Sequence, residues 1–173
     1  MTPHRMQSMV QRGEPIRERS CRGWRLDGMD LSGGVFLEVD FDGVSCIGTH
    51  FEEAQFDRCT LNGVQLNDAQ LKKAAFSQCT LPSANLTGAV LDDAVFHRCQ
   101  LPGSDFSRAS VADTKFMESA LSRSRFAATG SNPFSPSAAA TQARSAAAAG
   151  SNSRALRPAA MRVMSVHKSA SAS

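Results

Sequence analysis

Residues 54–73 read AQFDRCTLNGVQLNDAQLKK, and residues 74–93 read AAFSQCTLPSANLTGAVLDD. Both stretches carry a large apolar residue at every fifth position and a small residue two positions before it. A period of five fits neither the 3.6 residues per turn of an α-helix nor the alternation of a β-strand. The spacing therefore predicts a stack of short, similar units of the solenoid kind.

The large apolar column continues in both directions from these stretches, without interruption. Its 21 members are Leu26, Leu31, Phe36, Phe41, Cys46, Phe51, Phe56, Leu61, Leu66, Leu71, Phe76, Leu81, Leu86, Leu91, Phe96, Leu101, Phe106, Val111, Phe116, Leu121 and Phe126. The residues two positions earlier are nearly all small. One bulky and one small inward side chain per unit suit a narrow, close-packed interior. The other three positions of each unit are mostly polar and are expected to face water.

A second period, of 20 residues, lies on top of the first. Phenylalanines recur at this spacing from Phe36 to Phe116, and cysteines recur at 59, 79 and 99. Four units therefore form one coil, and successive coils are expected to lie about 4.8 Å apart, as hydrogen-bonded strands do. Eight glycines occupy the second position after a large residue or its equivalent at Cys21: Gly23, Gly28, Gly33, Gly43, Gly48, Gly63, Gly88 and Gly103. This placement predicts corners where the backbone adopts a positive φ.

Units such as ANLTG at 84–88 and SDFSR at 104–108 resemble the Ala-(Asp/Asn)-Leu-x-x consensus of pentapeptide-repeat proteins. The resemblance implies an all-β fold, a right-handed quadrilateral β-helix of about five coils. The expected organisation is a flexible basic arm at 1–20, the β-helix at 21–126, and an Ala/Ser-rich, mostly disordered basic tail at 127–173. Trp24 and Met29 are the only large residues in the small column, and they are expected to cover the open core as a lid.

The charges point to a candidate binding surface. Residues 26–57 contain eight acids and no Lys or Arg. Glu52/Glu53, Lys72/Lys73 and Asp92/Asp93 are 20 residues apart and are expected to stack as acid, base and acid on successive coils. Glu38 is likewise expected to meet Arg58, and all of these would be surface ion pairs of modest energy. Four other acids have no Lys or Arg 20 residues later, namely Asp27, Asp30, Asp40 and Asp42. These four are the candidate partner-binding surface, with a merely solvated face as the alternative.

No catalytic, cofactor-binding or metal-binding residues are assigned from the sequence. The glycines follow the corner period and form no phosphate-binding loop, and the histidines are not at metal-ligand spacings. The five cysteines form no CxxC pair and read as buried thiols of a reducing compartment. No stretch is apolar enough for a membrane span, and the absence of Tyr leaves no stacking platform for nucleic acid. The chain is accordingly expected not to be an enzyme.

The expected function is a non-enzymatic scaffold that binds a protein partner, as a monomer or a dimer. The resemblance implies two specific roles. One is a bacterial effector delivered into host cells by a type III system, which would be cytoplasmic in a bacterium or secreted without a cleaved signal peptide; Asn132-Pro133-Phe134 resembles a ligand of host endocytic adaptor domains. The alternative is a DNA-mimicking binder of DNA gyrase or topoisomerase. Residues 21–126 contain 14 acidic and 10 basic residues, so the body is only mildly acidic for a mimic of DNA.

Overall fold

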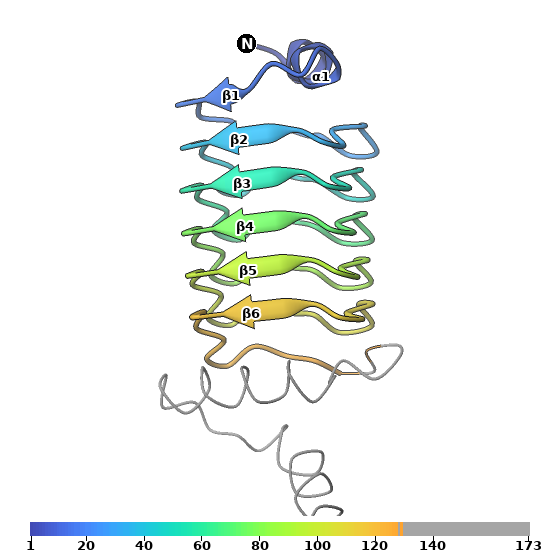
Figure 1. Cartoon of the computed structure of the whole chain (residues 1–173), viewed down its shortest axis with the longest axis vertical. Coiled ribbons are helices and arrows are strands. Elements are labelled where there is room, and N and C mark those ends of the chain that lie inside the picture. Colours follow the sequence, from blue (N-terminus) through green and yellow to red (C-terminus); the bar gives the residue numbers. More distant parts are fainter. Residues whose placement is uncertain (128, 130–173) are drawn as a thin grey trace, which may run out of the picture.

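The computed structural model describes residues 1–127 and residue 129, which form one helix followed by a column of parallel strands. Figure 1 shows the strands stacked one above the other, with the helix across the end that carries the first strand. The elements are α1 (Pro3–Gln11), β1 (Ile16–Arg17), β2 (Val35–Leu37), β3 (Gln55–Asp57), β4 (Ala75–Ser77), β5 (Val95–His97) and β6 (Lys115–Met117). The result is a β-solenoid of about five turns, as the sequence predicts.

The predicted 20-residue coil is confirmed by the strand register. Phe36 pairs with Phe56, and Phe56 with Phe76, so each coil repeats the one before it at a shift of 20 residues. Isolated parallel bridges continue the same shift on the other sides of the coil, as between Gln70 and Val90. Each coil thus has one side built from a short strand, of two residues in β1 and three in β2 to β6, and the other sides are held by single bridges.

The large apolar column fills the centre of the solenoid. Phe56, Phe76 and Phe96 are buried and stack with ring centroids 4.6 Å apart and planes inclined by 3°. Small residues such as Ala54 and Ala74 are fully buried beside them. The interior is therefore packed along its length, which confirms the predicted division between inward and outward positions.

The corners show the predicted backbone conformation. All eight corner glycines have φ between 61° and 73°. Non-glycine residues at the equivalent position adopt the same conformation, for example Arg58 (52°) and Lys73 (58°). Their backbone N–H groups donate to the next coil, from Arg58 to Ser77 O and from Lys73 to Asp92 O, both at 2.9 Å. These inter-coil bonds hold residues in a conformation that costs a non-glycine residue about 1 kcal/mol.

The first 20 residues differ from the flexible arm expected above, because they contain α1 and the first strand. Thr2 caps the helix through a bond from Arg5 N to Oγ1 of 3.3 Å, and Pro3 starts its first turn. The helix ends in a Schellman motif: Gly13, with φ of 72°, donates to Val10 O at 2.8 Å, and Glu14 donates to Met9 O at 2.9 Å.

Helix α1 closes the N-terminal end of the core. Met6 is 0% exposed and Val10 is 7% exposed, and both belong to the same apolar cluster as the coils. The stack also begins earlier than residue 21, because Ile16 in β1 pairs with Phe36. Trp24 and Met29, expected to form the lid, pack against the core but stay partly exposed, so the helix supplies the main cover. The expected C-terminal tail and its Asn132-Pro133-Phe134 motif lie outside the described residues.

Candidate binding surface

The four candidate acids do not form one patch. Asp30 lies in the column of bridges that continues to His50, whereas Asp40 lies in the column between Ser20 and Thr60. Ten residues are half of a 20-residue coil, so these two columns are on opposite sides of the solenoid. The structure brings Asp40 and Asp42 together, and it separates this pair from Asp30.

Asp40 and Asp42 have a basic partner, which lies on the coil before them. Arg22 Nε lies 2.6 Å from Asp40 Oδ2, and Arg22 Nη2 lies 3.0 Å from Asp42 Oδ2. Asp42 also accepts from the backbone N–H and the side-chain amide of Asn62, both at 2.9 Å. The 20-residue spacing toward the next coil correctly gave Asp40 and Asp42 no basic partner there, but it did not reveal Arg22, which lies 18 to 20 residues earlier.

Asp27 and Asp30 bind the backbone of the turns around them. Asp27 accepts from Ser45 Oγ and from Ile47 N, the latter at 2.9 Å, and its carboxylate lies 3.5 Å from Arg25 Nε. Asp30 accepts from Ser32 N at 3.1 Å. These carboxylates therefore satisfy N–H groups that the strand ladder leaves free.

The same hydrogen bonds stabilise the charged forms of these acids. The bond from Ser45 and the backbone bond from Ile47 lower the pKa of Asp27, and the bonds from Ser32 lower the pKa of Asp30. Partial burial opposes the charge on Asp40, but the bonds from Asp42 N and Arg22 exceed it, so the pKa of Asp40 is also lowered. In their charged forms, these acids thus help to stabilise the solenoid.

Two of the predicted ion pairs are present, whereas in the described part of the chain neither Lys72 nor Lys73 pairs with Asp92 or Asp93 on the following coil. Arg58 Nη1 lies 2.8 Å from Glu38 Oε1, and Lys73 Nζ lies 3.7 Å from Glu53 Oε1. All four side chains are about half exposed or more, so each pair is worth at most about 1 kcal/mol. Together with the Arg22 contacts, these two pairs neutralise much of the acidic section between residues 26 and 57.

The five cysteines are free and buried, as expected. The thiols of Cys59, Cys79 and Cys99 each donate to the carbonyl of the phenylalanine 23 residues earlier, at 3.4 Å. Burial raises the pKa of Cys21 to about 11, and the two neighbouring thiols together with burial raise the pKa of Cys79. Cys21 and Cys79 are therefore poor nucleophiles and poor metal ligands.

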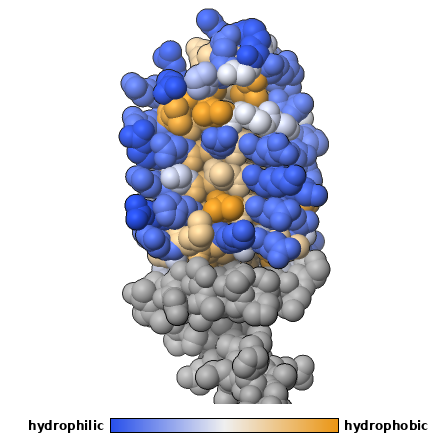
Figure 2. Space-filling view, in the orientation of Figure 1, coloured by the Kyte–Doolittle hydropathy of each residue, from blue (hydrophilic) through white to orange (hydrophobic). Residues whose placement is uncertain are grey.

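The outward side of the sheet is the most apolar side of the solenoid. Figure 2 shows apolar side chains along the middle of the sheet, between two hydrophilic borders and interrupted by hydrophilic side chains. At β3 (Gln55–Asp57) both outward residues are polar. The members of this apolar strip are the outward residues Val35, Leu37, Ala75, Val95 and Met117 of β2, β4, β5 and β6. Met117 is 40% exposed, and the other four are half-buried. In the outward columns of bridges on the other three sides, by contrast, only Val90 and Ala120 are apolar.

This strip is not evident from the sequence pattern. A five-residue period treats the four sides of a coil as equal, so it does not reveal which side forms the strand. Only the register of β2 to β6 shows that the residues flanking the phenylalanine column share one flat surface. In the sequence, the signal for this strip is the two residues that flank each phenylalanine of the 20-residue column from Phe36 to Phe116.

Within residues 1–127 and 129, no group of three or more His, Cys, Asp or Glu is arranged to hold a metal ion. The one described helix, α1, is too short and too polar to cross a membrane.

Comparisons with known proteins find one matching family model and several similar solved structures. The family model described as "Pentapeptide repeat region" matches residues 49–126. No curated protein sequence matches the chain. Among solved structures, the chain is similar to a pentapeptide repeat protein from the thylakoid lumen of Arabidopsis thaliana. That protein is 22% identical, with a TM-score of 0.48, and the match covers 64% of this chain and 70% of the other.

Two further structures show the same kind of likeness. QnrB1, a plasmid-mediated fluoroquinolone resistance protein, is 17% identical with a TM-score of 0.34, and the match covers 66% of this chain and 69% of the other. HetL, a pentapeptide repeat protein involved in heterocyst differentiation regulation in the cyanobacterium Nostoc, is 16% identical with a TM-score of 0.19. The match to HetL covers 75% of this chain and 92% of the other.

Proposed function

The chain belongs to the pentapeptide-repeat proteins, and we propose that it is a non-enzymatic β-helical scaffold that binds a protein partner through the outward side of its sheet. The observation that carries this proposal is the apolar strip of Val35, Leu37, Ala75, Val95 and Met117. Single exposed apolar residues are ordinary on a protein surface, but several apolar residues gathered on one side within a polar rim are typical of an interaction surface. Here the apolar residues form two groups, on β2 and on β4 to β6, with the outward Gln55 and Asp57 of β3 between them.

The charges beside the strip indicate what kind of partner fits it. At the corner that follows the strands, Glu38 pairs with Arg58, and Arg98 Nε lies 2.8 Å from Glu118 Oε2. Because these charges are already paired, the side has little net charge. A partner that presents an apolar, nearly neutral surface suits it best, whereas a polyanion such as nucleic acid would find no continuous basic surface there.

A pair of arginine substitutions tests the proposal. Val95→Arg places a charge in the middle of the strip, whereas Val90→Arg places the same charge on the neighbouring side, where Val90 is also a half-buried outward residue. A partner is first captured by cross-linking to the full chain and is then titrated against both variants. We expect Val95→Arg to weaken binding at least tenfold and Val90→Arg to leave it unchanged. Equal binding by both variants would rule out the strip.

The acidic residues are the second candidate surface. Asp40 and Asp42 keep 26% and 18% of their side-chain surface exposed and stand with Arg22 on one side of the solenoid. If a basic partner binds there, Asp40→Asn with Asp42→Asn weakens binding and reduces its dependence on salt, while Val95→Arg has no effect. The two pairs of variants therefore distinguish the two surfaces.

The cellular setting belongs to the same proposal. Delivery into host cells by a bacterial type III system suits the basic N-terminal segment, which has no acid before Glu14. Its test is a reporter fusion that registers arrival in the host cytoplasm. Gyrase binding suits the acidic section at 26–57, and its test is a supercoiling assay with added protein. Neither outcome changes the assignment of the binding strip, which rests on the variants above.

A further inference from the structure

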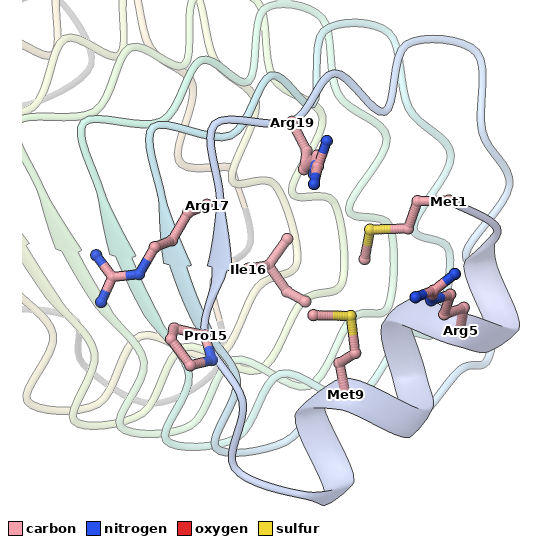
Figure 3. Close-up of a pocket in the computed structure, with 7 residues that line it drawn as sticks. All are labelled: Met1, Arg5, Met9, Pro15, Ile16, Arg17 and Arg19. Carbon is pink, nitrogen blue, oxygen red and sulfur yellow. The ribbon is translucent and has the colours of Figure 1, made fainter.

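A pocket of about 300 Å³ lies at the N-terminal end of the solenoid, between α1 and β1. Figure 3 shows the side chains of Met1, Met9 and Ile16 turned toward one another at its centre, with Arg19 and Arg5 beside them. Pro15 and Arg17 complete its lining, and the guanidinium of Arg17 extends away from the centre. Two elements therefore build the pocket, the cap helix and the first strand with its flanking residues.

The pocket is lined only by apolar and basic residues. Met1, Met9, Pro15 and Ile16 supply apolar surface, and the three remaining residues are arginines. No acidic residue lines the pocket. A largely apolar cavity with a few polar groups that fix orientation is the usual form of a small-molecule site, and about 300 Å³ is at the small end of the range for such sites.

The arginines of the pocket differ from their neighbours in having no ion-pair partner among the described residues. Arg12, at the end of α1, is held by Glu14 at 2.6 Å, and Arg22 is held by Asp40 and Asp42. Within residues 1–127 and 129, no carboxylate lies within ion-pair distance of Arg5, Arg17 or Arg19. Guanidinium groups pair in bidentate fashion with carboxylates and phosphates, so these arginines can accept an anion from outside.

We propose that this pocket binds a small amphipathic anion, with a carboxylate or phosphate head between Arg5 and Arg19 and a short unbranched aliphatic tail against Met9 and Ile16. The tail excludes water from the apolar floor, and the head pairs with the arginines. Each CH₂ group that enters the pocket strengthens binding about fourfold until the pocket is full. The site is separate from the apolar strip on the sheet and does not depend on the function proposed above.

Methyl NMR of the full chain labelled at methionine tests this proposal, because the protein carries its own control. Met9 reports on the pocket, and Met117 is an exposed methionine on β6, at the other end of the sheet. The probes are octanoate and octyl phosphate, with octanol lacking the charge and acetate lacking the tail. We expect saturable shifts of Met9 but not of Met117, at least tenfold tighter for the two octyl anions than for octanol or acetate. The tighter of the two anions identifies the head group.

Substitution of the arginines gives the second arm of the test. Arg5→Gln with Arg19→Gln removes both head-group partners at exposed positions, and Arg108→Gln is the matched control at an exposed arginine outside the pocket. We expect the double variant to bind the octyl anions at least tenfold more weakly and the control to bind them as the parent does. Equal shifts of Met9 and Met117, octanol binding as tight as octanoate, or a double variant that binds normally would each overturn the proposal.

Discussion

The environment of Phe76 is set by the residues on the coils above and below it more than by its neighbours in sequence. Its ring is 1% exposed and lies 4.6 Å from the rings of both Phe56 and Phe96. The adjacent Ser77 points outward from the same strand and is half-buried. Two consecutive residues therefore have opposite environments, as the alternation of a strand requires.

This contrast predicts how single substitutions affect stability. Phe76→Ala leaves a cavity in the middle of the ring stack and should lower the free energy of unfolding by about 3 to 5 kcal/mol. Phe76→Asp buries an unpaired charge and should prevent cooperative folding. Ser77→Asp should change stability by less than about 0.5 kcal/mol, because its side chain faces solvent. Denaturant unfolding followed by circular dichroism measures all three, and similar midpoints for Phe76→Asp and Ser77→Asp would contradict the register.

The cysteines give a second prediction at the same scale. All five are at most 1% exposed, and the pKa of Cys21 is raised to about 11. Because the thiolate is the reactive form, the native protein should resist iodoacetamide near pH 8. Mass spectrometry should find five modified cysteines after denaturation in guanidinium chloride and almost none before it. A thiol that reacts in the native protein as fast as in the denatured one would show that its coil opens.

Helix α1 caps the N-terminal end of the solenoid. A solenoid exposes the open core and the strand edge of its last coil unless another element covers them. Here Met6 and Val10, one turn of helix apart, complete the apolar cluster above Ile16. The helix has nine residues, which is too few for it to be stable on its own. The helix is therefore stabilised by packing against the first coil, and the first coil is ordered by the same contact.

Loss of the packing between α1 and the core should first destabilise the nearest coil. Met6→Asp places a charge at a fully buried site of α1, whereas Ser8→Asp places it at an exposed site of the same helix. Hydrogen exchange should accelerate for Met6→Asp at Glu18 and Cys21, whose N–H groups donate to the second coil, and much less at Leu81 in the middle. Ser8→Asp should exchange like the parent. Uniform acceleration along the solenoid would indicate that the coils open together.

The repeat made the coils predictable, and the parts without a repeat were missed. Twenty-one equivalent positions indicate one environment, so the register, the inward column and the corner glycines could be derived from spacing alone. Helix α1 occurs once, and its signals were few: Thr2 before Pro3, Met6 and Val10 four apart, and Gly13 at the end. Arg22 was missed as a partner of Asp40 because a long arginine reaches sideways to a residue 18 positions later, outside the strict 20-residue column.

At the scale of the whole molecule, the coils are joined by two kinds of bond that respond differently to the solvent. The backbone ladder and the ring stack carry no charge. A second set of bonds links charged side chains to the backbone or to arginine on another coil, as with Asp27 and Ile47 N or Asp40 and Arg22. Only this second set depends on the ionisation of carboxylates, so pH separates its contribution from that of the core.

The pH dependence of stability is the prediction that follows. The pKa values of Asp27, Asp30 and Asp40 are lower in the folded chain than the ordinary value of about 3.9. The unfolded chain therefore binds protons first as the pH falls. Stabilisation by these groups is complete above about pH 5 and is lost as the pH falls through the folded pKa values. Urea unfolding should give a constant free energy of unfolding between about pH 5 and 7, and a decrease below about pH 4.

Neutralising two of these acids should remove part of that decrease. Asp27→Asn with Asp30→Asn should lower stability at pH 7, where the parent has both carboxylates charged and hydrogen-bonded, and should bring the two proteins closer together at pH 3. Added salt should affect the difference weakly, since Asp27 bonds to a backbone N–H that screening does not remove. If the variant and the parent lost the same free energy between pH 5 and pH 3, Asp27 and Asp30 would be solvated surface charges. The inter-coil contribution would then rest on the carboxylates held by Arg22.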